Sequence, residues 1–216
     1  MTNKSTQAEK VYDYMLKKIV NCEYFPAQEM TAKEIVDETG FGLTPVREAL
    51  LLLQQNGVVE ILPRKGVRIA PLTEADIKEI YKMRALIEPQ ICMEYAQFYS
   101  RSKLFDYIDK FDADYDRSDY ERFQLDVEFH RFLIDIVDNK YLNSLYNTLM
   151  PAHVRIGVYE AVHSSTKHID DNIKQHKDII DAILKDDKAQ IRVSLMYHLN
   201  YALAYSINAL GNKKSE

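Results

Sequence analysis

The sequence has no long hydrophobic run. No apolar stretch in its 216 residues approaches the roughly 20 residues that a membrane-spanning helix needs. The N-terminus begins Met-Thr-Asn-Lys-Ser-Thr-Gln and contains no apolar segment of the kind found in secretory signals. We therefore expect a cytoplasmic protein without a membrane anchor.

Cysteine and, in most of the chain, glycine are scarce. Cys22 and Cys92 are far apart and in no metal-binding or redox spacing, so free reduced thiols are expected. After Pro71 only Gly157 precedes Gly211, and this shortage of helix breakers predicts nearly continuous helix.

The acidic charge is unevenly distributed. The net charge of −5 argues by itself against a protein coated in nucleic acid. Residues 1–70 hold nine basic and nine acidic side chains, however, so the whole excess lies in residues 71–216. This split is typical of a neutral or locally basic DNA-binding module followed by an acidic module.

Three short helices are predicted near the N-terminus. The first follows the apolar residues from Val11 to Ile19 and ends near residue 21. The second begins at Thr31, which forms a capping-box pattern with Glu34, and ends at Gly40. The third begins with Thr44 as the capping residue and Pro45 at the first helical position, and it ends at residues 56–57.

A hairpin with a basic tip follows. Two β-like runs, 58–62 and 67–70, are joined by Pro63, Arg64, Lys65 and Gly66. Helix, short helix, tight turn, helix and hairpin is the order of a winged helix-turn-helix, whose third helix enters the major groove of DNA. The fold class is therefore mainly α, with a winged helix-turn-helix domain over residues 1–71.

Several side chains of this region are suited to DNA contact. Arg47 lies near the start of the third helix and off its buried stripe, where it can reach a base edge or a phosphate. A single exposed basic residue is usually a solvated surface charge, but an ordered set is better evidence. The predicted DNA-binding residues are Lys33, Thr44, Arg47, Arg64, Lys65 and Gly66.

This region resembles the GntR family of bacterial regulators. The resemblance rests on the run Thr-Pro-Val-Arg-Glu-Ala-Leu at 44–50, on Gly-Val-Val at 57–59 and on Arg-Lys-Gly-Val at 64–67. Family members usually carry Ser-Arg where this chain has Gly42 and Leu43, and arginine is common at the position of Lys33. The resemblance implies binding to operator DNA, with a different base choice near Leu43 because leucine cannot grip guanine bidentately.

The rest of the chain, 72–216, is predicted to be an all-helical antiparallel bundle, because the connections between its helices are short. Caps and breakers divide it into six helices. The expected ranges are 74–99, 102–115, 119–138, 141–163, 169–186 and 188–210.

Four residues of this bundle form a candidate metal site. Asp126 and His130 are four apart and therefore share a helix face. His176 and His198 are each eleven residues from Asp187, which marks the break between the last two helices, so an antiparallel pair brings them to the same height. A lone histidine on an apolar face is usually a core residue, but this set predicts a divalent metal: zinc first, with nickel, iron or manganese as alternatives.

The same residues resemble the FCD ligand-binding domain of the FadR subfamily of GntR regulators, over about residues 75–210. Six helices are similar to the VanR type. The resemblance implies that the metal helps hold a small organic acid and that the protein is a homodimer. Arg84 and Arg155 are candidates for pairing with the acid's carboxylate, although either is equally suited to a structural salt bridge. His153, His163 and His168 are possible pocket-lining residues.

We therefore predict a ligand-responsive transcriptional repressor that binds double-stranded operator DNA and is not an enzyme. Two alternatives remain open. A metalloenzyme would use the Asp/His3 site to activate water, but this leaves residues 10–70 without a purpose. A protein-interaction module would use the metal only to stabilise its fold.

Overall fold

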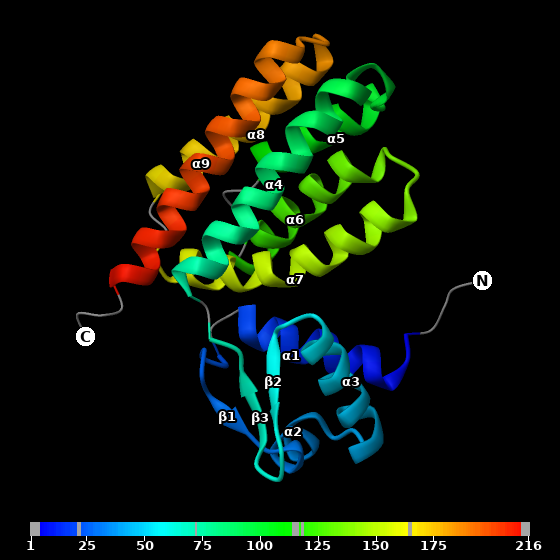
Figure 1. The fold of residues 1–216 in the computed structure, drawn as a ribbon, viewed down its shortest axis with the longest axis vertical. Coiled ribbons are helices and arrows are strands. Elements are labelled where there is room, and N and C mark those ends of the chain that lie inside the picture. The colour runs from blue at the N-terminus through cyan, green and yellow to red at the C-terminus, as the bar shows by residue number, and fades with distance from the viewer. Residues whose placement is uncertain are drawn as a thin grey trace. The chain divides into compact units, whose positions relative to one another are not determined.

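The computed structural model describes residues 5–20, 23–71, 73–113, 117, 119–163 and 166–212. The chain divides into two compact units, Met1–Leu72 and Thr73–Glu216 (Figure 1). Among the described helices, none is long and apolar enough to cross a membrane.

The first unit is a winged helix-turn-helix, as the sequence predicts. Its helices are α1 (Gln7–Val20), α2 (Ala32–Thr39) and α3 (Leu43–Gln55), and its strands are β1 (Glu29–Met30), β2 (Val59–Leu62) and β3 (Gly66–Ile69). The strands form an antiparallel sheet in the order β1-β3-β2. Strand β1 was not predicted, because a two-residue strand is too short to show an alternating pattern.

The helix boundaries follow from capping. Thr31 and Glu34 form the expected capping box at the start of α2, and Gly40 ends the helix in the left-handed conformation. The predicted start of α3 at Thr44 is wrong, because Gly42 is the capping residue and the helix begins at Leu43. Pro45 fits this earlier start, since the first N–H groups of a helix have no partner within it.

The turn of the wing depends on Gly66. The N–H of Lys65 donates to the carbonyl of Leu62 at 3.0 Å, and Arg64 between them has a φ of 65°. Gly66 has a φ of 124°, and a Cβ atom there would lie 2.2 Å from the carbonyl oxygen of Met30 in β1. Only glycine therefore allows β3 to pair closely with β1 at this point.

The second unit is an all-helical bundle, and the six predicted α-helices are found among its described residues. The first is shorter than predicted, because its last residues form the 3-10 helix η1, and the fifth begins at residue 166. The elements are α4 (Glu74–Tyr95), η1 (Ala96–Phe98), α5 (Arg101–Asp112), α6 (Asp119–Asp135), α7 (Lys140–His163), α8 (Thr166–Leu184) and α9 (Lys188–Asn212).

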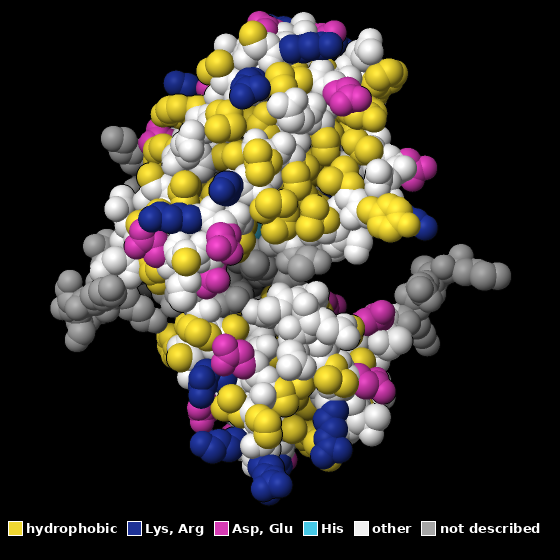
Figure 2. All heavy atoms as spheres, viewed as in Figure 1, with side chains coloured by type: hydrophobic (Ala, Val, Ile, Leu, Met, Phe, Trp, Pro, Cys, Tyr) yellow, Lys and Arg dark blue, Asp and Glu magenta, His cyan; other side chains and the backbone are white. Residues whose placement is uncertain are grey.

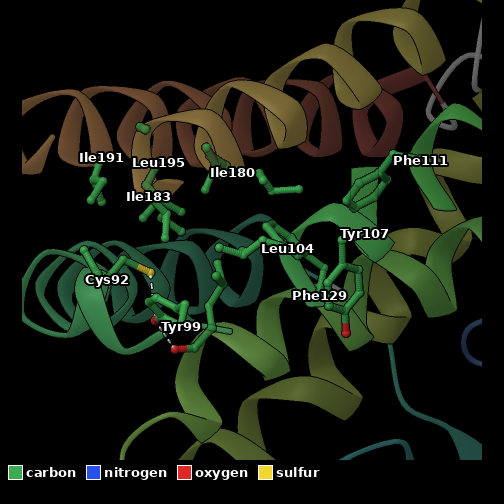
Figure 3. Packing of buried hydrophobic residues seen from close by; sticks show 14 of the residues in the cluster. Cys92, Tyr99, Leu104, Tyr107, Phe111, Phe129, Ile180, Ile183, Ile191 and Leu195 are labelled. Carbon is green, nitrogen blue, oxygen red and sulfur yellow. Dashed lines mark hydrogen bonds between the residues drawn. The ribbon is translucent and has the colours of Figure 1, made fainter. Parts of the chain in front are cut away.

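Aliphatic side chains of α8 and α9 face aromatic side chains of α5 and α6 in the core of this bundle (Figure 3). The rings of Tyr107 and Phe111 lie 5.2 Å and 5.4 Å from that of Phe129. Cys92 is a buried free thiol beside the hydroxyl of Tyr99, and burial raises its pKa to about 12. Cys22 lies outside the described residues. These side chains therefore form a closely packed core beside the polar cluster described next.

Candidate metal centre and DNA-binding surface

The structure brings the four predicted metal ligands together. Asp126 and His130 lie on α6, His176 on α8 and His198 on α9, and one ligand atom from each lies within 4.8 Å of the others. Nε2 of His176 is 3.1 Å from Oδ1 of Asp126, and Nε2 of His130 is 3.1 Å from Nε2 of His198.

Local sequence accounts for this convergence. The spacing of four residues aligns Asp126 and His130 on one face of α6. The short connection at residues 185–187 makes α8 and α9 antiparallel, so that the rings of His176 and His198 lie 4.5 Å apart. The ring of Phe111 stacks on His176 at 4.4 Å and restricts its rotation.

Hydrogen bonds fix the tautomers of the three histidines. Nδ1 of His130 donates to the carboxylate of Glu88 at 2.8 Å, because an ionised carboxylate can only accept. Nδ1 of His176 donates to the backbone carbonyl of Asn172 at 2.9 Å. Nδ1 of His198 donates to Oε1 of Gln175 at 3.1 Å. In neutral rings, the Nε2 atoms that face one another therefore all carry lone pairs.

This donor set fits a divalent metal. Nε2 of His176 is buried and makes no hydrogen bond, although Oδ1 of Asp126 lies 3.1 Å from it. The Nε2 lone pairs of His130 and His198 face each other, an arrangement that repels unless a cation lies between them. Outer partners that orient imidazole ligands in this way are typical of metal sites.

The protonation states also suit a metal. Burial lowers the pKa values of His130 and His198, which favours the neutral, ligating imidazole. Burial alone would raise the pKa of Asp126, but His130 and His176 outweigh it and hold that pKa well below its usual range. The cluster therefore offers an ionised carboxylate and, in His130 and His198, two imidazoles that favour the neutral form.

Sequence reasoning missed Glu88, which organises a buried polar network. Its Oε1 accepts from Nε of Arg84 and from the hydroxyl of Tyr146, both at 2.6 Å. Burial would raise the pKa of Glu88, but Arg84 and His130 outweigh it and keep the carboxylate ionised. The spacing of four between Arg84 and Glu88, on the first predicted helix of the bundle, was the signal that could have found it.

Two further donors in this network have no hydrogen-bond partner among the described residues. Nη1 of Arg84 donates to Nε2 of His153 at 2.7 Å, so Nδ1 of His153 carries the proton. Nη2 of Arg84 and Nδ1 of His153 are buried and unpartnered. Burial and Arg84 lower the pKa of His153 to about 3, so its ring is neutral. Nε2 of His153 is 3.8 Å from Oδ2 of Asp126, which joins this network to the cluster.

Asp126 is the most exposed of the four candidate ligands. Its side chain is 18% exposed, whereas the three histidines are at most 1% exposed. The side chains of Arg155, His163 and His168 lie outside the described part of the chain, although their backbones belong to α7 and α8.

The predicted DNA-binding residues lie on the surface of the first unit. Lys33 is exposed on α2, and Thr44 and Arg47 are exposed on the first two turns of α3. Arg64 and Lys65 are exposed at the end of the β2–β3 hairpin, where Figure 2 shows basic side chains gathered. The helix and the hairpin tip therefore offer the positive charge that contact with phosphates requires.

Family comparisons agree with both units. Residues 7–69 match the family described as bacterial regulatory proteins, gntR family, and residues 79–201 match the FCD domain. The chain belongs to the GntR family. It is a DNA-binding transcription regulator and not an enzyme, so the metalloenzyme alternative is wrong.

Curated relatives of this GntR chain are regulators too. The HTH-type transcriptional repressor RspR of Escherichia coli K12 is 23% identical, over 96% of this chain and 92% of its own length. The gluconate operon transcriptional repressor of Bacillus subtilis is 29% identical, over 80% of this chain and 72% of its own. The solved structure of E. coli McbR/YncC has the same fold, with a TM-score of 0.81 at 16% identity, covering 95% of this chain and 99% of the other.

Proposed function

We propose that this GntR regulator is a cytoplasmic repressor. Its affinity for operator DNA changes when a small organic acid binds beside a metal in the second unit. The observation that carries this proposal is the convergence of Asp126, His130, His176 and His198 next to two buried, unpartnered hydrogen-bond donors.

The DNA-reading part rests on α3 and the wing. Arg47 is long enough to reach a base edge in the major groove, while Thr44 offers a hydroxyl and a first-turn N–H to a phosphate. Lys33, Arg64 and Lys65 contact the DNA backbone, and Gly66 lets the wing turn tightly enough to approach it.

The metal part rests on the donor set. Three imidazoles and one carboxylate suit zinc, while nickel, iron and manganese accept the same ligands. When bound, such an ion supplies a Lewis-acidic coordination position that a carboxylate oxygen can fill. Glu88, Gln175 and the carbonyl of Asn172 hold the histidines in the orientation that this requires.

The acid-binding part rests on the unpartnered donors. An unpaired buried hydrogen-bond donor lowers the stability of a protein by roughly 1–3 kcal/mol. A ligand oxygen that accepts a hydrogen bond from Nη2 of Arg84 or Nδ1 of His153 would remove this cost. A carboxylate matches both donors because it accepts several hydrogen bonds and carries the opposite charge to arginine. Arg155 on α7 stays a second candidate anchor.

We also propose that the regulator is a homodimer, since helix-turn-helix proteins commonly read two half-sites with two copies. Helices α4 and α9 pack along one another in antiparallel fashion and leave large apolar side chains exposed. These are Leu86, Val193 and Tyr197, each about 60% exposed. Figure 2 shows apolar side chains gathered over α4.

The test combines metal analysis with DNA binding. Native mass spectrometry of the purified chain should report one metal per subunit and any acid that copurifies. Operator fragments selected from random DNA should then bind with an affinity that citrate or a smaller carboxylate changes roughly 5- to 150-fold, the range expected for allosteric coupling. His176→Ala should abolish both the metal and the carboxylate effect, whereas the exposed Lys174→Ala on the same helix should retain them.

The same experiment separates the remaining alternative, a purely structural metal. In that case chelation would lower the stability of the second unit, but no carboxylate would change DNA affinity in the metal-loaded protein. A chain that selects no DNA sequence at physiological salt would contradict the DNA-reading part outright.

A further inference from the structure

An exposed leucine occupies the first turn of the recognition helix. Leu43 is the first residue of α3 and is 44% exposed. The preceding residue, Gly42, is the capping residue and has no side chain that could cover Leu43. Most protein side chains that contact DNA are polar. An apolar side chain at the position of Leu43 would contact DNA favourably only at an apolar group.

Leu43 shares a helix face with Arg47. The two are four residues apart, and both point away from the buried stripe of α3. That stripe consists of Val46, Ala49, Leu50 and Leu53. A helix lying in the major groove with Arg47 toward the bases therefore turns Leu43 toward them as well.

The major groove contains one good apolar feature, the C5-methyl group of thymine. One helical turn advances about 5.4 Å and one base step about 3.4 Å, so neighbours on this face read bases one to two pairs apart. The leucine side chain has no hydrogen-bond donor or acceptor for a base edge. It can distinguish thymine from other bases only by burying the C5-methyl group of thymine against its own apolar surface.

We propose that Leu43 is a specificity-determining residue that packs against the methyl group of a thymine, one to two base pairs from the base contacted by Arg47. This rests on the proposed reading of DNA by Arg47. The operator therefore carries a thymine in each half-site at a position where an arginine would select guanine.

Leu51 provides a matched control. It is also a leucine of α3, is 49% exposed, and lies two turns further along the helix. Bases are contacted mainly by the N-terminal residues of a recognition helix, so Leu51 is expected to lie beyond their reach. Because both leucines are exposed, their replacement by alanine should leave the fold intact, which circular dichroism and thermal melting can check.

The experiment selects binding sites from random double-stranded DNA with the full-length wild type and with Leu43→Ala, Leu43→Arg and Leu51→Ala. The wild type and Leu51→Ala should both select a thymine at one position of each half-site. Leu43→Ala should lose preference at that position alone, and Leu43→Arg should select guanine there. Replacing the selected thymine by deoxyuridine should weaken wild-type binding about fourfold, the effect of one buried methyl group, and should not weaken binding by Leu43→Ala.

Identical base profiles for the wild type and Leu43→Ala, with Arg47→Ala altering its own position, would overturn the assignment while leaving the proposed DNA reading intact. A wild type that selects no sequence at all would overturn both. An equal loss with deoxyuridine in the wild type and in Leu43→Ala would also overturn it, since the methyl group would then act through another residue or through DNA shape.

Discussion

Nδ1 of His130 on α6 donates a hydrogen bond to Oε2 of Glu88 on α4 at 2.8 Å. Through this bond a residue that offers no ligand atom to the cluster determines which nitrogen of His130 faces it. Glu88 in turn is held by Arg84 and Tyr146. The orientation of a candidate metal ligand is thereby coupled to a charged network in the core.

Glu88→Gln should lower metal affinity about 10- to 100-fold, the usual effect of removing an outer partner of a histidine ligand. The amide can still accept a hydrogen bond, but it no longer provides the charge that fixes His130 and balances Arg84. Zinc titration against a competing chelator measures the effect. Glu94→Gln, an exposed carboxylate on the same helix, is the control.

Because Glu88 and Arg84 form a buried ion pair, the same change should also destabilise the second unit, by roughly 3–5 kcal/mol. Affinity must therefore be measured where circular dichroism shows a folded chain. An unchanged zinc affinity in folded Glu88→Gln would show that the bond does not orient the ligand.

Metal removal should lower the melting temperature. A ligand at a hundred times its Kd stabilises the folded state by about 2.7 kcal/mol, and chelation removes that contribution. Scanning calorimetry before chelation, after it and after readdition of zinc tests this. His198→Ala should melt at the same temperature with and without zinc, and a zinc-dependent shift that survives this change would place the metal elsewhere.

Gly66→Ala should destabilise the first unit by more than about 1 kcal/mol. The new Cβ would lie 2.2 Å from the backbone of Met30, and the φ of 124° is unfavourable for alanine. Gly42→Ser is the matched control, because its φ is −68° and a Cβ there lies 3.8 Å from its nearest neighbour. Serine also caps helices well, so this variant should match or slightly exceed the wild type in urea unfolding.

Lys65→Ala and Arg47→Ala should weaken DNA binding in different ways. If Lys65 neutralises one phosphate, its loss reduces the slope of log affinity against log salt by about 0.9 and weakens all sequences alike. Arg47→Ala should weaken the selected operator more than random DNA. Fluorescence anisotropy across a salt series measures both slopes, and identical behaviour of the two variants would contradict the assigned roles.

Tyr197→Lys should shift the protein from dimer to monomer if α4 and α9 form the dimer interface, because a charge is costly inside an apolar contact. Light scattering across a dilution series measures the mass. Phe105→Lys is the control, because Phe105 is 50% exposed but lies on α5, which is not one of the two helices of the proposed interface; this variant should remain dimeric.

Local signals predicted most of the fold. Capping residues such as Thr31 and Gly40 act over a few residues, so they can be read directly from the chain. The start of α3 was misplaced because Thr44 and Pro45 are compatible with the first turn in more than one register. Strand β1 exists only through its pairing with β3, a contact between distant segments that no short pattern reveals.

The candidate site divides in the same way. Spacing along α6 and symmetry about Asp187 were sufficient to group the four ligands. The hydrogen-bond partners of those ligands, Glu88, Tyr146 and Gln175, belong to no motif in the sequence. They reach the ligands, or one another, across helix contacts. Their roles depend on how the helices pack, which sequence periodicity does not specify.

The symmetric placement of His176 and His198 about the turn at residues 185–187 has a consequence for how this family can diverge. A residue inserted within the turn only lengthens the loop, so the two helices can keep the same contacts and the two histidines the same relative height. A residue inserted between Asp187 and His198 would rotate that imidazole by about 100° around α9 and carry it away from the other ligands. Insertions and deletions should therefore be tolerated in the turn and at the far end of α9, and be rare in the ten residues that separate Asp187 from His198.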